Sequence, residues 1–250
     1  MRALSASEWL GVWEQGLAQL PFQKALTILT AACPETTPEG LAKFSIGQRD
    51  AHLLTLREWT FGGELVGLAS CPQCAEGLEL AFDVADIRVS SHGEASLSGV
   101  EDARTFSVSV AAHEVTFRLP NSLDLEAMGS DDPDVIRRKL LERCLLAIYR
   151  EGEQRPFDYL PEEVAAAVVE RMEQADPQGN VQLALSCPSC KHEWEAAFDI
   201  VSFFWAEINA WAYRILREVH TLASAYGWRE VDILAMSPWR REAYLSVVAE

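Results

Sequence analysis

Two cysteine motifs with the same spacing are the residues of this sequence best suited to chemistry. The first, CPQC, runs from Cys71 to Cys74, and Phe-Asp-Val at 82–84 follows it. The second, CPSC, runs from Cys187 to Cys190, and Phe-Asp-Ile at 198–200 follows it at the same distance. Because the cysteine spacing and the downstream run both recur, we interpret them as two copies of one structural unit.

The four motif cysteines predict a structural zinc site. Zinc prefers four tetrahedral ligands, and a Cys-x-x-Cys turn supplies two thiolates while its backbone N–H groups point at the sulfurs. We therefore predict that Cys71, Cys74, Cys187 and Cys190 bind one Zn²⁺ and leave no coordination position open. Closing the loop of 112 residues between the two motifs costs about 4 kcal/mol. A structural zinc site supplies roughly 10 kcal/mol or more, so the metal can join these distant parts of the chain.

Other uses of the cysteines remain open. A Cys-x-x-Cys pair can be a redox dithiol, but redox motifs usually begin a helix, whereas each motif here leads into a strand-like segment. The four cysteines could also be ordinary core residues. His192 lies close enough in sequence to replace one cysteine ligand, although we expect it to be solvated. Cys33 and Cys144 stand in apolar helical patterns and are predicted to be small core residues.

The net charge of the chain indicates which classes of partner it can bind. Its 250 residues include 38 acidic and 21 basic residues, a formal net charge of −17. Binding to nucleic acid relies on clustered Lys and Arg, so we expect no nucleic-acid partner and instead proteins with basic surfaces.

The sequence also lacks the segments expected of exported or membrane-bound chains. No stretch of about eighteen apolar residues occurs, and Glu8 and Glu14 interrupt the first apolar run. We therefore expect neither secretion nor a membrane partner. Six cysteines, four of them in CPxC pairs, suit a reducing cytoplasm better than a disulfide framework.

Apolar periodicity predicts an α+β fold that is mostly helical and has three parts. Residues 1–65 have helical spacing, residues 66–200 mix strands with helices and hold both cysteine motifs, and residues 201–250 return to helical spacing. We expect a small strand-containing centre, closed by the zinc site and flanked by N-terminal and C-terminal helices.

Local signals place several elements within these parts. Ser45 is a good N-cap for a helix that ends at Gly62, and the first cysteine motif is then expected directly after an all-helical segment. Alternation across residues 106–119 predicts a β-hairpin, with His113 solvated at its turn. A further helix is predicted to carry a stripe that continues to Ile148, and a long amphipathic helix is expected after Ile200.

Motifs for catalysis are missing from the sequence. It contains no HExxH, no Gly-rich phosphate loop, no GxSxG elbow and no Cys-His pair outside the motif cysteines. Paired acids such as Asp131-Asp132 stand at predicted helix starts, where capping and the helix dipole favour carboxylates. We therefore expect a protein that is not an enzyme.

Longer stretches around the cysteine motifs resemble a known family. They are Ser-Ile-Gly-Gln-Arg-Asp at 45–50, the first CPxC, Phe-Arg-Leu-Pro-Asn-Ser-Leu-Asp-Leu at 117–125, and the second CPxC with Phe198-Asp199. Together they resemble a family found in gene clusters for contractile phage-tail-like injection systems, whose members are similar to the baseplate hub assembly chaperones of T-even phages. Residues 226–228, 233–234 and 240–245 are similar to closing segments of phage tail and baseplate assembly proteins.

The resemblance implies a cytoplasmic factor that helps to assemble a baseplate, its hub or its spike by binding those proteins. The zinc prediction comes from the cysteine spacing in this chain and not from the resemblance. A structural baseplate subunit retained in the finished particle shares every one of these sequence features. Two further alternatives are a zinc-ribbon protein that binds nucleic acid and a dithiol enzyme.

Overall fold

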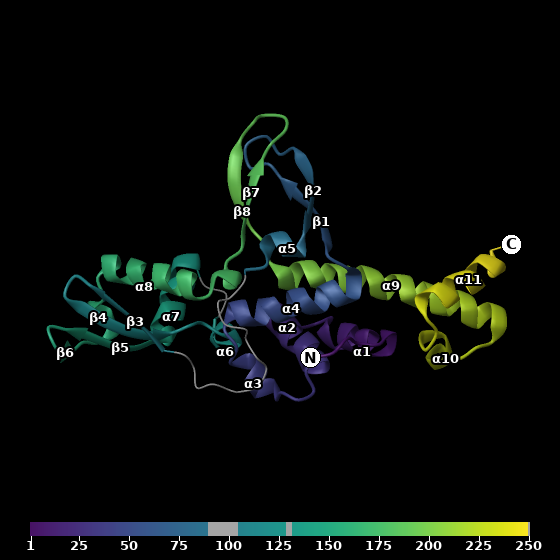
Figure 1. Cartoon of the computed structure of the whole chain (residues 1–250), viewed down its shortest axis with the longest axis horizontal. Coiled ribbons are helices and arrows are strands. Elements are labelled where there is room, and N and C mark those ends of the chain that lie inside the picture. The colour runs from purple at the N-terminus through teal and green to yellow at the C-terminus, as the bar shows by residue number, and fades with distance from the viewer. Residues whose placement is uncertain (90–104, 129–131, 250) are drawn as a thin grey trace. The chain divides into compact units, whose positions relative to one another are not determined.

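A computed structural model of the chain describes residues 1–89, 105–128 and 132–249 (Figure 1). Two compact units are present, one formed by Met1–Glu35 together with Ile200–Glu250 and the other by Thr36–Asp199. Helices hold 55% of the described residues and strands 20%, which confirms the prediction of a mostly helical α+β fold with small sheets. Of the sequence expectations, Asp131 lies outside the described residues.

The first unit joins the two ends of the chain in a helical core. Its helices are α1 (Ala6–Gly16), α2 (Pro21–Ala32), α9 (Ile200–Tyr226), α10 (Glu230–Leu234) and α11 (Pro238–Val248). Trp9 of α1 packs edge-to-face on Phe204 of α9, with ring centroids 5.5 Å apart. The indole Nε1–H of Trp13 donates to Asn209 Oδ1 at 2.9 Å, so this buried tryptophan also satisfies its polar atom.

The long helix α9 confirms the apolar stripe predicted after Ile200. Its buried residues recur with helical spacing and include Phe204, Ile208, Ala212, Ile215, Val219 and Leu222. At the C-terminal end of α9, Val219 and Leu222 form a small core with Ile233 of α10, and Tyr244 and Leu245 of α11 pack against it. The last two helices are therefore held by apolar contacts with the end of α9.

The second unit contains the strands and several short helices. Its helices are α3 (Pro38–Ala42), α4 (Ile46–Phe61), α5 (Val84–Ile87), α6 (Ser122–Glu126), α7 (Pro133–Cys144) and α8 (Glu162–Ala175). Its strands are β1 (Glu64–Ser70), β2 (Gly77–Asp83), β3 (Thr105–Val110), β4 (His113–Arg118), β5 (Leu145–Arg150), β6 (Glu153–Gln154), β7 (Gln182–Ser186) and β8 (Glu193–Ala197). Two short 3₁₀ turns lie at Phe157–Tyr159 and Pro177–Gly179.

An antiparallel sheet with the order β3-β4-β5-β6 forms one end of this unit. Its core residues Val115, Phe117 and Ile148 pack with Leu141 of α7 and with two valines of α8. The predicted hairpin at 106–119 is confirmed. The predicted helix through Ile148 is wrong, because α7 ends at Cys144 and Ile148 pairs with Val115 in the sheet. Burial of Ile148 is compatible with a helix or a strand, and its pairing with β4 makes this segment a strand.

The segment at 45–50 is packed closely against distant parts of the same unit. Ser45 caps α4 with a capping box to Gln48, as predicted. The backbone N–H of Gly47 donates to Asp176 Oδ2 at 2.8 Å, and a Cβ at this position would lie 2.0 Å from Asp176 Oδ1. Only glycine therefore allows this approach without movement of the neighbouring residues.

The segment at 117–125 is organised by a buried carboxylate. Asp124 is fully buried and accepts two hydrogen bonds from the Arg118 guanidinium, at 2.6 and 2.8 Å. Arg143 of α7 donates a third, at 3.2 Å. This network orders the turn before α6, and the Ile46 N–H donates to Pro120 O at 3.1 Å. The two segments that carry the family resemblance are thus adjacent in the fold.

Candidate metal centre

Each cysteine motif is the tip of a two-stranded antiparallel hairpin, and the two hairpins have the same register. In the first, Ser70 pairs with Gly77, and in the second Ser186 pairs with Glu193. The N–H of Phe198 donates to Val181 O, which matches the pairing of Phe82 with Leu65. The sequence repeat therefore corresponds to a repeated hairpin.

The first strand of this repeat, β1, was not predicted, because the helix was expected to end at Gly62 and the first cysteine motif to follow an all-helical segment directly, with no strand between them. A comparison of Ala69-Ser70 with Leu185-Ser186, each directly before a cysteine motif, is the sequence signal that could have found it. The Phe-Asp-aliphatic run also differs from the expected strand. Val84 begins α5, and the Asp83 side chain caps that helix by accepting from the Ala85 N–H at 2.9 Å.

The two cysteine turns have matching backbone geometry. The N–H of Cys71 donates to Glu76 O, and the N–H of Cys187 donates to His192 O, each at 2.9 Å. The residue after the second cysteine has positive φ in both, 60° at Ala75 and 62° at Lys191. A residue in the left-handed conformation at the same position of each turn gives the two turns the same backbone geometry, so each motif presents its two thiols in the same way.

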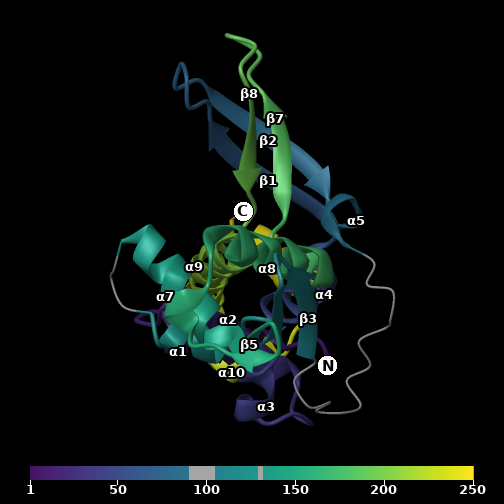
Figure 2. The same cartoon turned by 90° about the vertical axis from the view of Figure 1, so that its left-hand side faces the viewer.

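The hairpins pack against each other as an approximate two-fold pair (Figure 2). Phe82 and Phe198 occupy equivalent positions in the repeat and contact each other edge-to-face, with centroids 5.6 Å apart. Above them, Cys71 and Cys187 are buried in one cluster with Leu78, and Trp194 packs against it. Apolar side chains of both hairpins therefore hold the two cysteine turns face to face.

The four sulfurs form a compact group that fits one metal ion. Sγ of Cys71 lies 3.6 Å from Sγ of Cys190, and Sγ of Cys74 lies 3.6 Å from Sγ of Cys187. All four atoms lie within 4.8 Å of one another. A tetrahedral zinc site with bonds of about 2.3 Å requires sulfurs about 3.8 Å apart. The cysteines can therefore hold a metal ion, and their chemistry is that of a closed thiolate site.

Electrostatics among the thiols also favour a bound cation. The backbone N–H groups of Cys190 and Ser189 lower the pKa of the Cys187 thiol to about 7. The backbone N–H of Glu76 lowers the pKa of Cys74, but the neighbouring thiols and burial raise it overall, to about 12. One thiolate therefore disfavours the next at this distance, and a divalent cation removes that repulsion.

The structure bears on the other uses of the cysteines. The two sulfur contacts of 3.6 Å join different hairpins, and each CPxC precedes a strand, so the motifs lack the following helix that lowers thiol pKa in redox proteins. His192 is not in the group of potential ligands and stacks on Trp194. Cys33 and Cys144 are buried, as predicted, and burial raises the pKa of both thiols.

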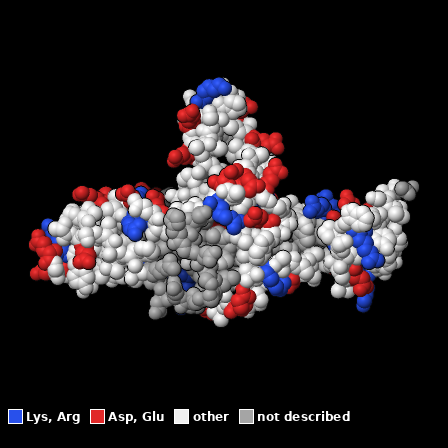
Figure 3. All heavy atoms as spheres, in the orientation of Figure 1, with Lys and Arg blue, Asp and Glu red and all other residues white. Residues whose placement is uncertain are grey.

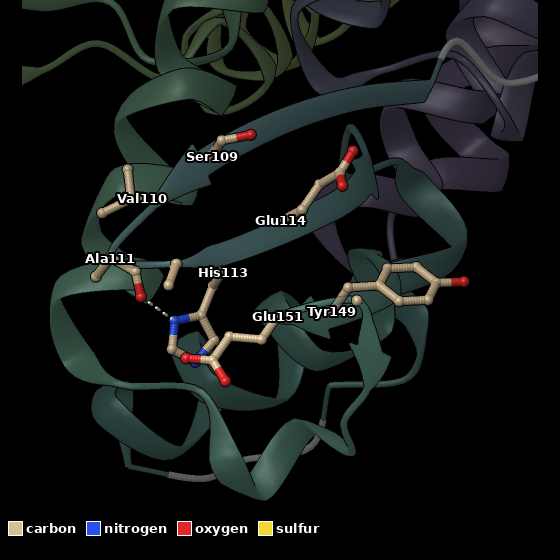
Figure 4. Close-up of a pocket in the computed structure, with 9 residues that line it drawn as sticks. Ser109, Val110, Ala111, His113, Glu114, Tyr149 and Glu151 are labelled. Atoms are coloured by element: carbon tan, nitrogen blue, oxygen red, sulfur yellow. Dashed lines mark hydrogen bonds between the residues drawn. The ribbon is translucent and has the colours of Figure 1, made fainter.

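A second feature is a hollow of 370 Å³ beside the turns that join β3 to β4 and β5 to β6 (Figure 4). His113 lies there, and the expectation that it is solvated is wrong, because it is only 5% exposed and its Nδ1 lies 2.8 Å from Ala111 O. Ser109 also lines the hollow, but Figure 4 shows its side chain directed away from the histidine ring. The hydroxyl of Tyr149, which also lines the hollow, points away from the ring as well in Figure 4, so neither of these residues places a hydroxyl on that histidine.

Comparisons with known proteins place most of the chain in one family. The profile described as T4 bacteriophage base plate protein matches residues 18–205. This range includes both hairpins and the segments at 45–50 and 117–125. No curated protein and no solved structure matched. In the part of the chain that the structure describes, every helix is too short or too polar to cross a membrane.

Proposed function

The chain belongs to the family of T4 bacteriophage base plate proteins, and we propose that it is a non-enzymatic assembly factor, or chaperone, for the baseplate of a contractile phage-tail-like injection particle. The observation that carries this proposal is the family match, which spans the metal-binding hairpins and both packed sequence segments. The protein acts by binding hub or spike proteins of the baseplate, with no nucleic-acid or membrane partner. It works in the cytoplasm before the particle is complete.

Zinc, in this proposal, is the metal at Cys71, Cys74, Cys187 and Cys190, and its role is structural. Four thiolates in two matched turns leave no position for substrate or water. The ion ties β1–β2 to β7–β8 across an insertion that contains the four-stranded sheet, α7 and α8. Its function is to keep the two hairpins in register so that the surface they present to partners is rigid.

The charge distribution supports basic protein partners. Residues 36–199 contain 29 acidic and 14 basic residues, whereas the remaining segments contain 9 acidic and 7 basic residues. Nearly all of the net negative charge therefore belongs to the second unit. Such a surface repels nucleic-acid phosphates and attracts proteins rich in Lys and Arg.

The C-terminal helices supply one candidate contact for a partner. Trp239 of α11 is 81% exposed, and Val231 of α10 is 61% exposed. Tryptophan is enriched at the residues that dominate binding energy in protein interfaces, and an exposed tryptophan has no role in packing the unit's own core. We include α10 and α11 in the proposed contact surface.

An affinity pull-down tests the proposal. The tagged chain is expressed with the neighbouring genes of its cluster, and bound proteins are identified by mass spectrometry. Recovery of hub, spike or wedge proteins is expected. Recovery of nucleic-acid machinery alone would reject a baseplate role, and a low-salt gel shift with duplex DNA and RNA would then test the zinc-ribbon alternative directly.

The second candidate is a structural subunit that remains in the baseplate, and the family description itself supports it. The two roles differ in the finished particle. An assembly factor is present in partial assemblies and absent from purified particles, whereas a structural subunit is present in both at a fixed ratio to hub protein. Quantitative mass spectrometry of the two fractions separates them.

A further inference from the structure

The two hairpins share one fold but present different outer faces. Residues at 64, 66 and 68 of β1 correspond to 180, 182 and 184 of the second copy, because the hairpin registers are the same. Val66 and Leu68 of β1 point outward and are 52% and 87% exposed. Their counterparts are Gln182 and Ala184.

The fold does not require the apolar pair on β1. The second hairpin forms the same ladder with Gln182 and Ala184 at these positions, and its inner face makes equivalent contacts. An exposed valine and leucine on a narrow two-stranded sheet gain no hydrophobic free energy on folding, and they favour aggregation. Their presence therefore needs another explanation. Burial by a partner supplies one, because a leucine gains its hydrophobic free energy only when water is removed from it.

Acidic residues surround the apolar pair on the same face of the hairpin. Leu68 pairs directly with Glu79, and Glu64 pairs directly with Asp83. Residues 64–87 contain five acidic and no basic residues, and Figure 3 shows carboxylates along the two hairpins. Like charges opposite each other weaken a hairpin, so the placement of Glu64 against Asp83 costs stability in the free protein. A basic partner offsets that repulsion.

We propose that the outer face of β1–β2, formed by Glu64, Val66, Leu68, Glu79, Ala81 and Asp83, is a docking surface for a protein patch with apolar side chains at its centre and Lys or Arg at its edge. This rests on the proposed function, in which the partner is a baseplate protein. Leu68 is the central anchor and the carboxylates select the partner by charge. The metal site at the tip holds this face in place against the second hairpin.

Photo-cross-linking tests the docking surface in cells that express the neighbouring genes. The photoreactive residue p-benzoylphenylalanine replaces Leu68 in one variant and Ala184, its equivalent in the second hairpin, in the other. We expect position 68 to cross-link one protein through a peptide that contains Lys or Arg beside apolar residues, and position 184 to give no such product. No product from position 68, or the same product from both positions, overturns the proposal.

The identity of the cross-linked protein separates this inference from the proposed function. A basic protein from outside the baseplate supports the docking surface and rejects the baseplate role. A partner peptide without basic residues, or a cross-linking yield that is insensitive to added salt, rejects the charge complementarity on which the inference depends.

A paired substitution measures the contribution of the apolar residues. The variant V66Q/L68A gives the first hairpin the outer residues of the second, so its fold and zinc content are expected to be unchanged. Its affinity for the cross-linked partner is expected to fall about 10-fold to 100-fold, as follows from exposing one to two aliphatic side chains. Wild-type affinity in V66Q/L68A overturns the proposal. The variant L146A is the matched control, because Leu146 of β5 is 50% exposed and belongs to a different sheet with no part in the proposed contact surface.

Discussion

Replacing one buried ligand of the cysteine cluster is the most direct perturbation of this protein. Cys187 is fully buried, and its Sγ lies 3.6 Å from that of Cys74. The variant Cys187→Ser leaves three thiolates and a hydroxyl, which is a poor zinc ligand. The 112 residues between Cys74 and Cys187 are then no longer closed by the metal.

The magnitude follows from what the metal supplies and what closing that loop costs. A structural zinc site supplies roughly 10 kcal/mol, and closing the loop takes back about 4 kcal/mol as chain entropy. We therefore expect Cys187→Ser to lower the free energy of unfolding by about 6 kcal/mol. At roughly 2–4 °C per kcal/mol for a domain of this size, the Tm of the second unit falls by about 12–24 °C.

Calorimetry and metal analysis provide the assay. Wild-type protein is expected to contain one zinc ion per chain. The Cys187→Ser variant, purified from cells that express it at the same level, is expected to contain none. Ser189→Ala changes the same turn but keeps the backbone N–H that faces Cys187, so it retains zinc and Tm. Cys144→Ala removes a buried thiol elsewhere, so it loses stability and retains zinc. A Cys187→Ser protein with one zinc and the wild-type Tm would refute the metal site.

Three further predictions concern buried charges and close packing in the second unit. Asp124→Asn removes the partner of two arginines and lowers the free energy of unfolding in urea by about 3 kcal/mol at neutral pH. Gly47→Ala places a Cβ 2.0 Å from Asp176 Oδ1 and costs about 1–3 kcal/mol in thermal unfolding, whereas Gly77→Ala enters open space and changes stability by less than about 0.5 kcal/mol. Burial raises the pKa of Asp50 from 3.8 to about 6, so between pH 4 and 7 the free energy of unfolding of the wild-type falls by about 2 kcal/mol relative to that of Asp50→Asn.

For each of these three predictions, one result would exclude the physical explanation given for it. Burial raises the pKa of Asp124, but hydrogen bonds from the arginines and from the Asn121 N–H outweigh burial and lower it, so the stabilisation by this carboxylate is present at neutral pH and is lost in acid. An effect of Asp124→Asn that is unchanged below pH 3 would exclude that account. Equal stability of the two glycine variants would exclude the close approach at Gly47. For Asp50, stability that rises between pH 4 and 7 relative to the asparagine variant would reverse the predicted sign.

Several features of this protein are readable from the sequence because they depend on neighbouring residues. The cysteine spacing identified all four members of the cluster, since ligand type and bite are local properties of a Cys-x-x-Cys turn. The capped start of α4 and the β3–β4 hairpin were also predicted, because N-caps and period-two alternation are short-range signals. The long stripe of α9 is helical over its whole length for the same reason.

Other features depend on partners far away in the chain and were not available to a local interpretation. Residues 145–150 carry apolar spacing that suits a helix, and only the ladder with β4 makes them a strand. A polar histidine at a hairpin turn was expected to be solvated, but His113 is buried, pairs with Arg150 of β5 and contacts the backbone of the turn at Ala111.

The sequence by itself determined which residues form the cysteine cluster, the helical character of the terminal segments and the acidic charge. The tertiary structure decided that β1 completes a second matching hairpin, that the sulfurs of Cys71 and Cys190 from different hairpins lie 3.6 Å apart, and that Leu68 is left exposed. The physical reason is that capping, turn geometry and ligand spacing act over a few residues. Strand pairing and burial depend instead on segments further apart in the chain, 33 residues for the pair of Val115 and Ile148 and 119 residues for the contact of Cys71 with Cys190.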